Sequence, residues 1–268
     1  QMNIYLQRLP FKRFGIEPLV RWQLHKLRQW DQLSSNRADC LVANSRFTAR
    51  RIFKYWGRTS KVLHPPVEVD RFSYRKPRGE YYLCVCRLVP NKRVDLIVNA
   101  FNKLKLPLII VGEGVEKKYL MSMAKPNVQI VGYQTSQQVS TLMESCRAFV
   151  YGGVEDFGIA PVEAMASGAP VIAFARGGLL DTVRCFSEDP STATGLLFPS
   201  QDINSLVNAV SWFEEKKLWR ELNSEYLCNW ANQFSTKKFR TRFEEILMRA
   251  WETHKKASLI APYESDIK

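Results

Sequence analysis

The sequence predicts an α/β fold in which helices cover both faces of a parallel sheet. Short apolar segments alternate with helical patterns along most of the chain, which is the order expected of a parallel sheet. Several of these segments end at glycines that allow tight turns. The expected strands span residues 81–86, 108–111, 128–131, 148–151, 171–173 and 195–199.

The length and composition fit a folded protein with a sizeable core. The chain has 268 residues, of which 46% are hydrophobic, so one large or two small domains can be built. No uninterrupted apolar run approaches the roughly 20 residues of a membrane span, and no signal-peptide pattern is present. The chain begins at Gln1 rather than Met. We therefore expect a fragment of a longer protein.

The strong positive charge calls for an anionic partner. A net charge of +13 and a pI near 9.5 suit nucleic acid, an anionic membrane surface or a phosphate-bearing substrate. Nucleic acid is the least favoured partner, because the basic residues are spread out and no nucleic-acid-binding motif focuses them. The six cysteines show neither zinc-ligand spacing nor the density of a disulfide scaffold. We expect reduced thiols in a cytoplasmic protein.

Residues 1–34 are rich in basic and aromatic side chains and are expected to be mostly helical. Such a helix packs on its own domain or touches anionic lipid headgroups at a membrane surface. Packing is the favoured interpretation, and both stay open. The apolar residues concerned are Phe11, Phe14, Leu19, Trp22, Leu27 and Trp30.

The next segment predicts a short strand, a helix and an extended linker. Residues 39–45 form the strand, and Ser45 can cap a helix over residues 47–56. Two consecutive prolines favour an extended linker over residues 61–70. His64 lies in this linker, and a lone histidine there is more often an exposed or packing residue than a catalytic base.

Further helices are expected over residues 94–105, from a cap at Asp202 to residue 213, and over residues 219–233 and 236–254. The last helix is long enough to reach another domain.

The stretch from Tyr151 to Gly168 predicts a ligand site at a helix start. Pro161 is tolerated only in a first helical turn, so the helix is expected over residues 160–167. The backbone amides near Phe157, Gly158 and Ile159 then lie at the positive end of the helix dipole, where a phosphate or a sugar hydroxyl can bind.

Two carboxylates bracket this helix start. Glu155 is placed on the preceding loop, and Glu163 lies within the helix. An arbitrary pair of glutamates would be part of a solvated helix. Here the helix leads directly into a buried strand, which places the pair where open parallel sheets bind ligands.

Arg87 and Lys92 lie in the loop after the strand at 81–86. Arginine binds a diphosphate through two nitrogens and lysine adds a point charge, so the loop is suited to holding one. Alone, such a pair would be solvated loop cations. Gly112 follows the strand at 108–111, and Gly132 and Tyr133 follow the strand at 128–131.

Glu155 and Glu163, with seven residues between them, resemble the Glu-x7-Glu signature of the retaining glycosyltransferases of family 4. Members of that family have a B-type fold of two Rossmann-like domains. The resemblance implies that the predicted Rossmann-like sheet is the second of these domains, which binds the sugar donor. It also implies that Glu155 lies at the donor sugar, that Glu163 holds the nucleotide ribose, and that Arg87 and Lys92 hold the diphosphate.

Other matches extend the resemblance over about residues 38–213. Gly112 lies in a Gly-Glu-Gly loop like that of the family, and backbone groups near Gly132 and Tyr133 are expected to hold the base. Gly177 and Gly178, followed by Asp181, resemble a Gly-Gly-x-x-Glu element expected to form a turn beside the phosphates.

Two positions depart from the family pattern. Many members have glycine where Cys86 and Arg93 stand. The Lys-Arg-Val-Asp run at 92–95 resembles members linked to bacterial polysaccharide synthesis, which often use mannose donors.

The resemblance also predicts the domain organisation. Residues 1–60 are expected to be the tail of an N-terminal acceptor domain and residues 61–70 the interdomain hinge. Residues 71–235 form the donor-binding domain, and residues 236–268 form a helix that returns toward the N-terminal domain.

These observations predict a cytoplasmic retaining glycosyltransferase that transfers a sugar, with mannose favoured. The donor is a GDP- or UDP-linked sugar, and the acceptor is a glycan or lipid-linked glycan. A location at the inner face of the membrane is an alternative. No cofactor and no metal are expected, because no Asp-x-Asp motif is present and Arg87, Lys92 and the helix amides can stabilise the leaving diphosphate. Without the missing N-terminal domain we expect donor binding but no transfer.

Two other functions stay open. A hydrolase could use Glu155 and Glu163 as acid and nucleophile. A non-catalytic module could bind a nucleotide sugar without transferring it.

Overall fold

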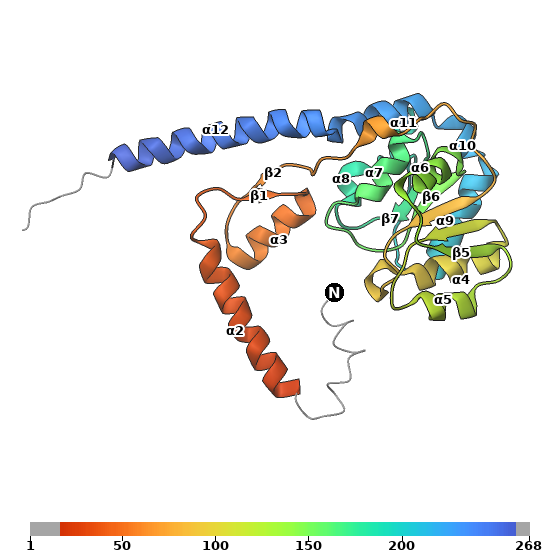
Figure 1. The fold of residues 1–268 in the computed structure, drawn as a ribbon, viewed down its shortest axis with the longest axis horizontal. Coiled ribbons are helices and arrows are strands. Elements are labelled where there is room, and N and C mark those ends of the chain that lie inside the picture. The colour runs from red at the N-terminus through yellow and green to blue at the C-terminus, as the bar shows by residue number, and fades with distance from the viewer. Residues whose placement is uncertain (1–16, 261–268) are drawn as a thin grey trace, which may run out of the picture.

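The computed structural model describes residues 17–260, with side chains as far as residue 256, and contains a six-stranded parallel sheet (Figure 1). The strand order is β5-β4-β3-β6-β7-β8 and every pairing is parallel. The α/β prediction is confirmed, and each predicted strand is present within two residues at either end. The strands are β3 (Tyr82–Val85), β4 (Leu108–Val111), β5 (Val128–Gly132), β6 (Ala148–Tyr151), β7 (Val171–Phe174) and β8 (Gly195–Phe198).

The strand order reverses in the middle of this sheet. From β3 the chain proceeds outward to β4 and β5, then returns to β6 beside β3 and continues outward to β7 and β8. The loops after β3 and β6 therefore leave the sheet in opposite directions. In open α/β sheets, the carboxyl ends of two such strands border a crevice in which ligands bind.

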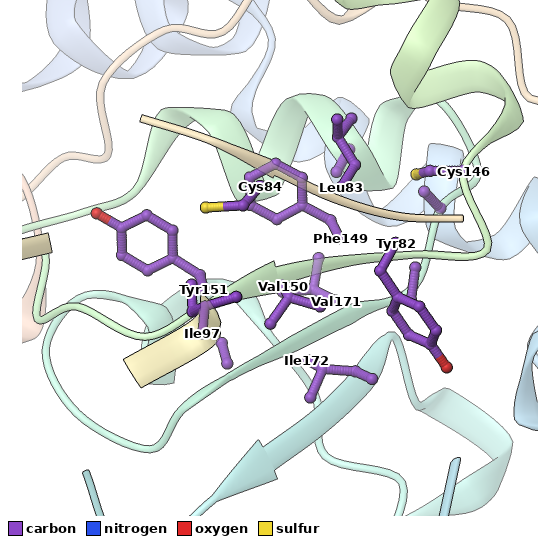
Figure 2. Packing of buried hydrophobic residues seen from close by; sticks show 14 of the residues in the cluster. Tyr82, Leu83, Cys84, Ile97, Cys146, Phe149, Val150, Tyr151, Val171 and Ile172 are labelled. Carbon is purple, nitrogen blue, oxygen red and sulfur yellow. The ribbon is translucent and has the colours of Figure 1, made fainter. Parts of the chain in front are cut away.

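Helices cover both faces, so most of the strands are apolar along their length. On one face α4 (Val94–Leu104) contacts both α5 (Lys117–Met123) and α9 (Ile203–Glu215). On the other face α7 (Ile159–Ala166) contacts both α6 (Ser136–Ser145) and α11 (Ser224–Ala231) (Figure 1). Between them, side chains such as Leu83, Phe149 and Ile172 are fully buried (Figure 2).

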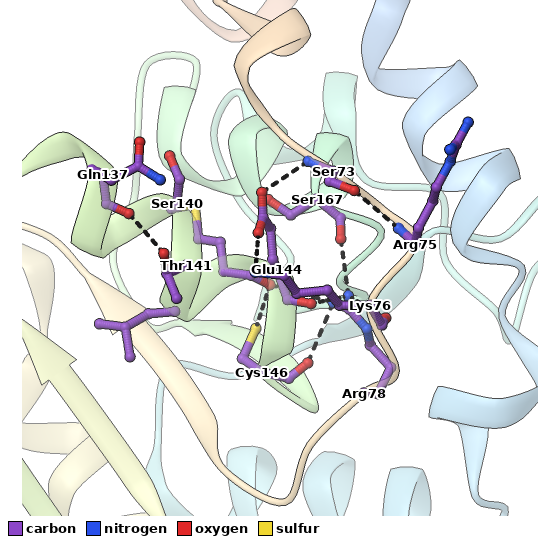
Figure 3. Close-up of polar contacts among 12 residues, drawn as sticks. Ser73, Arg75, Lys76, Arg78, Gln137, Ser140, Thr141, Glu144, Cys146 and Ser167 are labelled. Carbon is purple, nitrogen blue, oxygen red and sulfur yellow. Dashed lines mark hydrogen bonds and ion pairs between the residues drawn. The ribbon is translucent and has the colours of Figure 1, made fainter.

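Arg78 joins the C-terminal ends of two helices (Figure 3). Its guanidinium donates hydrogen bonds to the carbonyls of Met143 and Cys146 at the end of α6, and of Ser167 at the end of α7, at 3.1–3.4 Å. Burial lowers the pKa of Arg78. A cation at a helix C-terminus donates to carbonyls that have no partner within the helix. Its charge also interacts favourably with the negative end of the helix dipole. Arg78 thereby anchors the end of α7 opposite its N-terminus.

The segment before the sheet forms α2 (Glu17–Ser35), β1 (Val42–Ala43), α3 (Arg46–Trp56) and β2 (Lys61–Val62). β1 and β2 pair in parallel as a separate two-stranded sheet. The Ser45 hydroxyl accepts a hydrogen bond from the Thr48 amide, so the predicted cap of α3 is confirmed. The linker begins within β2 and ends in a 3-10 turn, η2 (Val69–Arg71).

The N-terminal helix α2 contacts α3, but the apolar side chains named for it are largely exposed among the described residues. Leu19, Trp22, Leu27 and Trp30 of α2 are all at least half exposed, while Phe11 and Phe14 lie outside the described residues. The predicted boundaries at residues 60, 70 and 235 stay predictions.

The helix expected over residues 219–233 is wrong as one element. The structure has α10 (Leu218–Glu221), then α11, then a 3-10 turn, η5 (Asn232–Phe234). Leu222 is buried with an extended backbone, and the Asn223 side chain accepts a hydrogen bond from the Tyr226 amide. Asparagine at such a position starts a new helix, so the chain turns where periodicity alone predicts continuity.

The C-terminal helix α12 (Thr236–Ile260) extends six residues beyond the predicted end at residue 254. His254 Nδ1 lies 3.4 Å from the Asp39 carboxylate, so the helix reaches the segment that precedes the sheet. Within residues 17–260, no helix has the length and apolar composition needed to span a membrane.

Candidate functional site

Lys92 and Glu155 meet where the strand order reverses. Lys92 ends a 3-10 turn, η3 (Pro90–Lys92), after β3, and Glu155 lies in the loop after β6. The Lys92 ammonium donates a hydrogen bond to Glu155 Oε1. The two side chains are 19% and 23% exposed, so solvent still reaches both. The structure thus places a predicted phosphate ligand beside the predicted sugar-site carboxylate.

Gly153 allows these two loops to approach. A Cβ built on Gly153 would lie 3.0 Å from both the Asn91 carbonyl oxygen and Lys92 Cα. Contacts this short force a neighbouring backbone to shift. Glycine at residue 153 therefore lets the Lys92 turn rest directly on the Glu155 loop.

Arg87 is not brought to Glu155. It follows β3, its side chain is exposed, and within the described residues its guanidinium forms no hydrogen bond or ion pair. It lies at the same edge of the sheet and is open to a ligand. Its role in holding a diphosphate stays a prediction.

Glu163 projects from α7 and pairs with Arg71, a residue that sequence reasoning missed. Arg71 Nη2 lies 3.1 Å from Glu163 Oε1. Burial raises the pKa of Glu163, the Arg71 charge opposes this shift, and Glu68 adds to it. Arg71 follows the linker and belongs to no recognisable motif. Nothing in the sequence therefore predicts its ion pair with Glu163.

The raised pKa predicts a specific pH dependence for Glu163→Gln. A carboxyl whose pKa is higher when folded stabilises the protein most below its unfolded pKa, roughly 4.3. That stability is lost as the pH rises through the folded value. We therefore expect Glu163→Gln to melt at a higher temperature, relative to wild type, at pH 7 than at pH 4. Thermal unfolding at both pH values checks this.

The matched control is Glu188→Gln, which removes the charge of an exposed loop glutamate. Its melting difference from wild type should change less between the two pH values. If the melting temperature of Glu163→Gln relative to wild type were lower at pH 7 than at pH 4, the attraction of Arg71 would outweigh the effect of burial. The raised pKa of Glu163 would then be contradicted.

The start of α7 offers backbone amides as predicted. The helix begins at Ile159, one residue before the expected start, and Gly158 has a φ of 97°, which glycine adopts readily. Within the described residues, the amides of Phe157, Gly158 and Ile159 donate to no protein acceptor. The arrangement suits an anion or a hydroxyl at the helix N-terminus.

The Phe157 ring is part of the core and not of this surface. It is 4% exposed and stacks on His64 with ring centroids 5.4 Å apart. His64 Nδ1 also lies 3.1 Å from the Asn44 carbonyl oxygen. The packing interpretation of His64 is confirmed, and Phe157 offers a ligand only its backbone.

The loops after β3, β4 and β5 form one continuous edge. The Gly112 amide donates to the Gly132 carbonyl at 2.8 Å, and the Leu88 amide donates to the Glu113 carbonyl at 2.8 Å. The Tyr133 amide donates to the Glu113 carboxylate at 3.2 Å, and the Tyr133 side chain is exposed. The predicted base-binding residues therefore lie together, and their contact with a base stays a prediction.

The turn at Gly177 and Gly178 holds the backbone of Glu155. The Gly178 amide donates to the Glu155 carbonyl at 2.8 Å. Asp181, in the short helix α8 (Leu179–Thr182), accepts hydrogen bonds from the backbone and side chain of Arg46 at 2.6 and 2.9 Å. The predicted turn is present, and its acidic residue bonds to α3.

Two hollows in the described surface lie elsewhere. One of about 520 Å³ is lined by residues of the linker and α12, including Asp70, Lys237 and Arg242. Another of about 340 Å³ lies between β8 and α9 beside Trp212. Neither of these two hollows includes Lys92 or Glu155. No cluster of three or more potential metal ligands occurs among the described residues.

Comparisons with known proteins give a family match and several related sequences. Residues 67–229 match the family model described as glycosyl transferases group 1. The chain is 29% identical over 231 residues to the alpha-1,3/1,6-mannosyltransferase ALG2 of Saccharomyces cerevisiae, covering 65% of this chain and 46% of that protein. It is 32% identical over 162 residues to a GDP-mannose-dependent alpha-mannosyltransferase of Corynebacterium glutamicum, covering 55% of this chain and 38% of that protein.

Solved structures show the same fold. Anabaena HepE in complex with UDP-glucose superposes with a TM-score of 0.68 at 20% identity, covering 79% of this chain and 64% of that one. The sucrose-phosphate synthase of Thermosynechococcus elongatus gives a TM-score of 0.71 at 20% identity, covering 85% and 62%. The chain spans about half the length of the curated relatives it matches.

Proposed function

The chain belongs to the group 1 glycosyl transferases, and from this premise we propose that it transfers mannose from GDP-mannose with retention of the anomeric configuration. The observation that carries the proposal is the meeting of Lys92 and Glu155 at the reversal of strand order. A lysine that can bind a phosphate, next to a carboxylate that can bind sugar hydroxyls, suits a ligand in which a sugar is bonded to a phosphate. A nucleoside diphosphate sugar has this chemistry.

Each predicted residue has a physical task in such a transfer. Arg87, Lys92 and the amides at the start of α7 stabilise the negative charge that develops on the leaving diphosphate, without a metal ion. The Glu155 carboxylate accepts hydrogen bonds from sugar hydroxyls. Glu163 binds the ribose hydroxyls, which explains why a carboxylate is kept where burial raises its pKa.

The choice of mannose and GDP rests on the relatives. The Corynebacterium glutamicum protein is named for GDP-mannose, and the Saccharomyces cerevisiae protein is named a mannosyltransferase. The structure of Anabaena HepE contains UDP-glucose, so UDP-glucose is the second candidate donor. The acceptor we propose is a glycan or lipid-linked glycan. We place the reaction in the cytoplasm, or at the inner face of the membrane.

Donor binding tests the proposal directly. Isothermal titration calorimetry with GDP-mannose, UDP-glucose, GDP and UDP should show one nucleotide sugar and its matching nucleotide binding in the micromolar to millimolar range typical of substrates. Absence of binding for all four would contradict it. Release of free mannose without an acceptor would instead favour a hydrolase. We also propose that transfer requires an acceptor-binding N-terminal domain.

A further inference from the structure

Tyr151 is a buried tyrosine whose hydroxyl reaches the candidate site. It is the last residue of β6 and only 2% exposed. Its ring is nearly parallel to that of Phe149, with centroids 6.5 Å apart, and lies beside Cys84 (Figure 2). The ring is part of the hydrophobic core, while the hydroxyl leaves the core at the carboxyl end of the strand.

The hydroxyl donates a hydrogen bond to Glu155 Oε1. A buried hydroxyl without a partner would be costly, so this contact fixes the carboxylate as well as satisfying the tyrosine. Burial raises the pKa of Tyr151, and the charge of Glu155 raises it further. The hydroxyl therefore stays protonated and remains a donor.

Both donors to Glu155 bind the same oxygen. Oε1 accepts hydrogen bonds from Lys92 and from Tyr151, whereas Oε2 accepts none from the described residues. The backbone of Glu155 is also held, because its carbonyl accepts from the Gly178 amide. The carboxylate is thus held at one oxygen, and the other is open to an outside donor such as a sugar hydroxyl.

Lys92 and Tyr151 differ in how firmly they hold Glu155. Lys92 has a flexible side chain and an ammonium that a diphosphate would also attract. The ring of Tyr151 is fixed by core packing, so its hydroxyl stays in place when a ligand binds. When Lys92 turns to a phosphate, Tyr151 remains as the donor that orients the carboxylate.

We propose that Tyr151 is a positioning residue, which holds Oε1 of Glu155 so that Oε2 faces the sugar of the donor. This inference rests on the proposed function. It predicts an effect on the sugar-dependent part of donor affinity and none on nucleotide affinity, because the tyrosine acts only through Glu155.

The test compares two buried tyrosines. Tyr151→Phe removes the hydroxyl and keeps the ring. The matched control is Tyr82→Phe in β3, where a fully buried tyrosine donates to Glu214 Oε1 at 2.5 Å, on α9 and away from Glu155. By calorimetry we expect both variants to bind GDP within about twofold of wild type. Only Tyr151→Phe should bind GDP-mannose about 10-fold more weakly, the loss of one hydrogen bond to a charged group. UDP and UDP-glucose serve as a second pair.

The outcomes separate the two proposals. If the wild-type protein binds GDP-mannose, and Tyr151→Phe has the same ratio of GDP-mannose affinity to GDP affinity as wild type, the positioning role is wrong and the proposed function stands. A wild-type protein that binds neither nucleotide sugar would overturn both. A ligand-free arm tests the contact itself, through urea unfolding of Tyr151→Phe, Glu155→Gln and the double variant. Non-additive effects support the contact, and additive effects overturn it.

Discussion

Lys92→Ala is expected to weaken binding of GDP roughly 10- to 150-fold while leaving binding of guanosine nearly unchanged. A charge-assisted hydrogen bond contributes about 1.5 to 3 kcal/mol, and each 1.4 kcal/mol is about tenfold in affinity. The nucleoside has no phosphate, so it should not depend on this residue. Arg87→Ala is expected to act in the same direction, because its exposed guanidinium lies at the same edge. Calorimetric titrations with GDP and guanosine measure both effects.

Lys103→Ala is the matched control for these cations. Lys103 is exposed near the end of α4, where it contacts Asn204 of α9 and neither Lys92 nor Glu155. This variant should bind GDP as wild type does, which excludes a general effect of lowering the net charge. Equal losses of GDP and guanosine binding in Lys92→Ala would show that Lys92 does not contact the diphosphate.

Substitutions of the two glutamates are expected to affect the binding of different ligands. Glu163→Gln should weaken GDP and GDP-mannose together, by roughly 10- to 100-fold, because a ribose contact is present with or without the sugar. Glu155→Gln should leave GDP affinity nearly unchanged and weaken GDP-mannose. In an enzyme that includes an acceptor domain, Glu155→Gln should also lower kcat on the order of 100-fold, as expected for an electrostatic group at the reacting sugar.

Titration of GDP and GDP-mannose into both variants decides the assignment. Glu188→Gln on the exposed loop is the control for loss of a negative charge. The reverse pattern, with GDP affinity lost in Glu155→Gln and kept in Glu163→Gln, would show that the two ends of the donor are interchanged.

The proposed ribose contact of Glu163 and its burial have opposite expected consequences. Burial makes the ionised carboxylate costly, and Arg71 offsets part of that cost. We therefore expect the stability of Glu163→Gln relative to wild type to rise from pH 4 to pH 7, while the variant loses nucleotide affinity. A residue kept only for folding would not show this combination.

Local patterns predicted most of the elements. The six strands follow from short apolar runs between turns, and the caps Ser45 and Asp202 accept hydrogen bonds from the amides of Thr48 and Ser205. These features depend on neighbours within a few residues, so the sequence displays them directly. The break at Leu222 was missed because an asparagine cap inside an apolar periodicity is a weak signal.

Residues of the candidate site could be named from the sequence only where a motif marks them. Glu155, Glu163 and the start of α7 lie within one stretch, and Lys92 follows a strand end. Arg71 lies 92 residues from Glu163 in the chain, and nothing local indicates their contact. Tyr151 looks like an ordinary core residue of a buried strand, so its hydroxyl contact with Glu155 could not be anticipated.

The sequence by itself determined the alternation of strands and helices, the start of α7 to within one residue and the types of residue available for binding. Only the tertiary structure decided that β3 and β6 are neighbours, and hence that Lys92 and Tyr151 both donate to Glu155. The physical reason is that helix starts and strands are set by short-range hydrogen bonding and periodicity. Strand order is set by how the whole set of helices packs on the sheet, which no single stretch of sequence encodes.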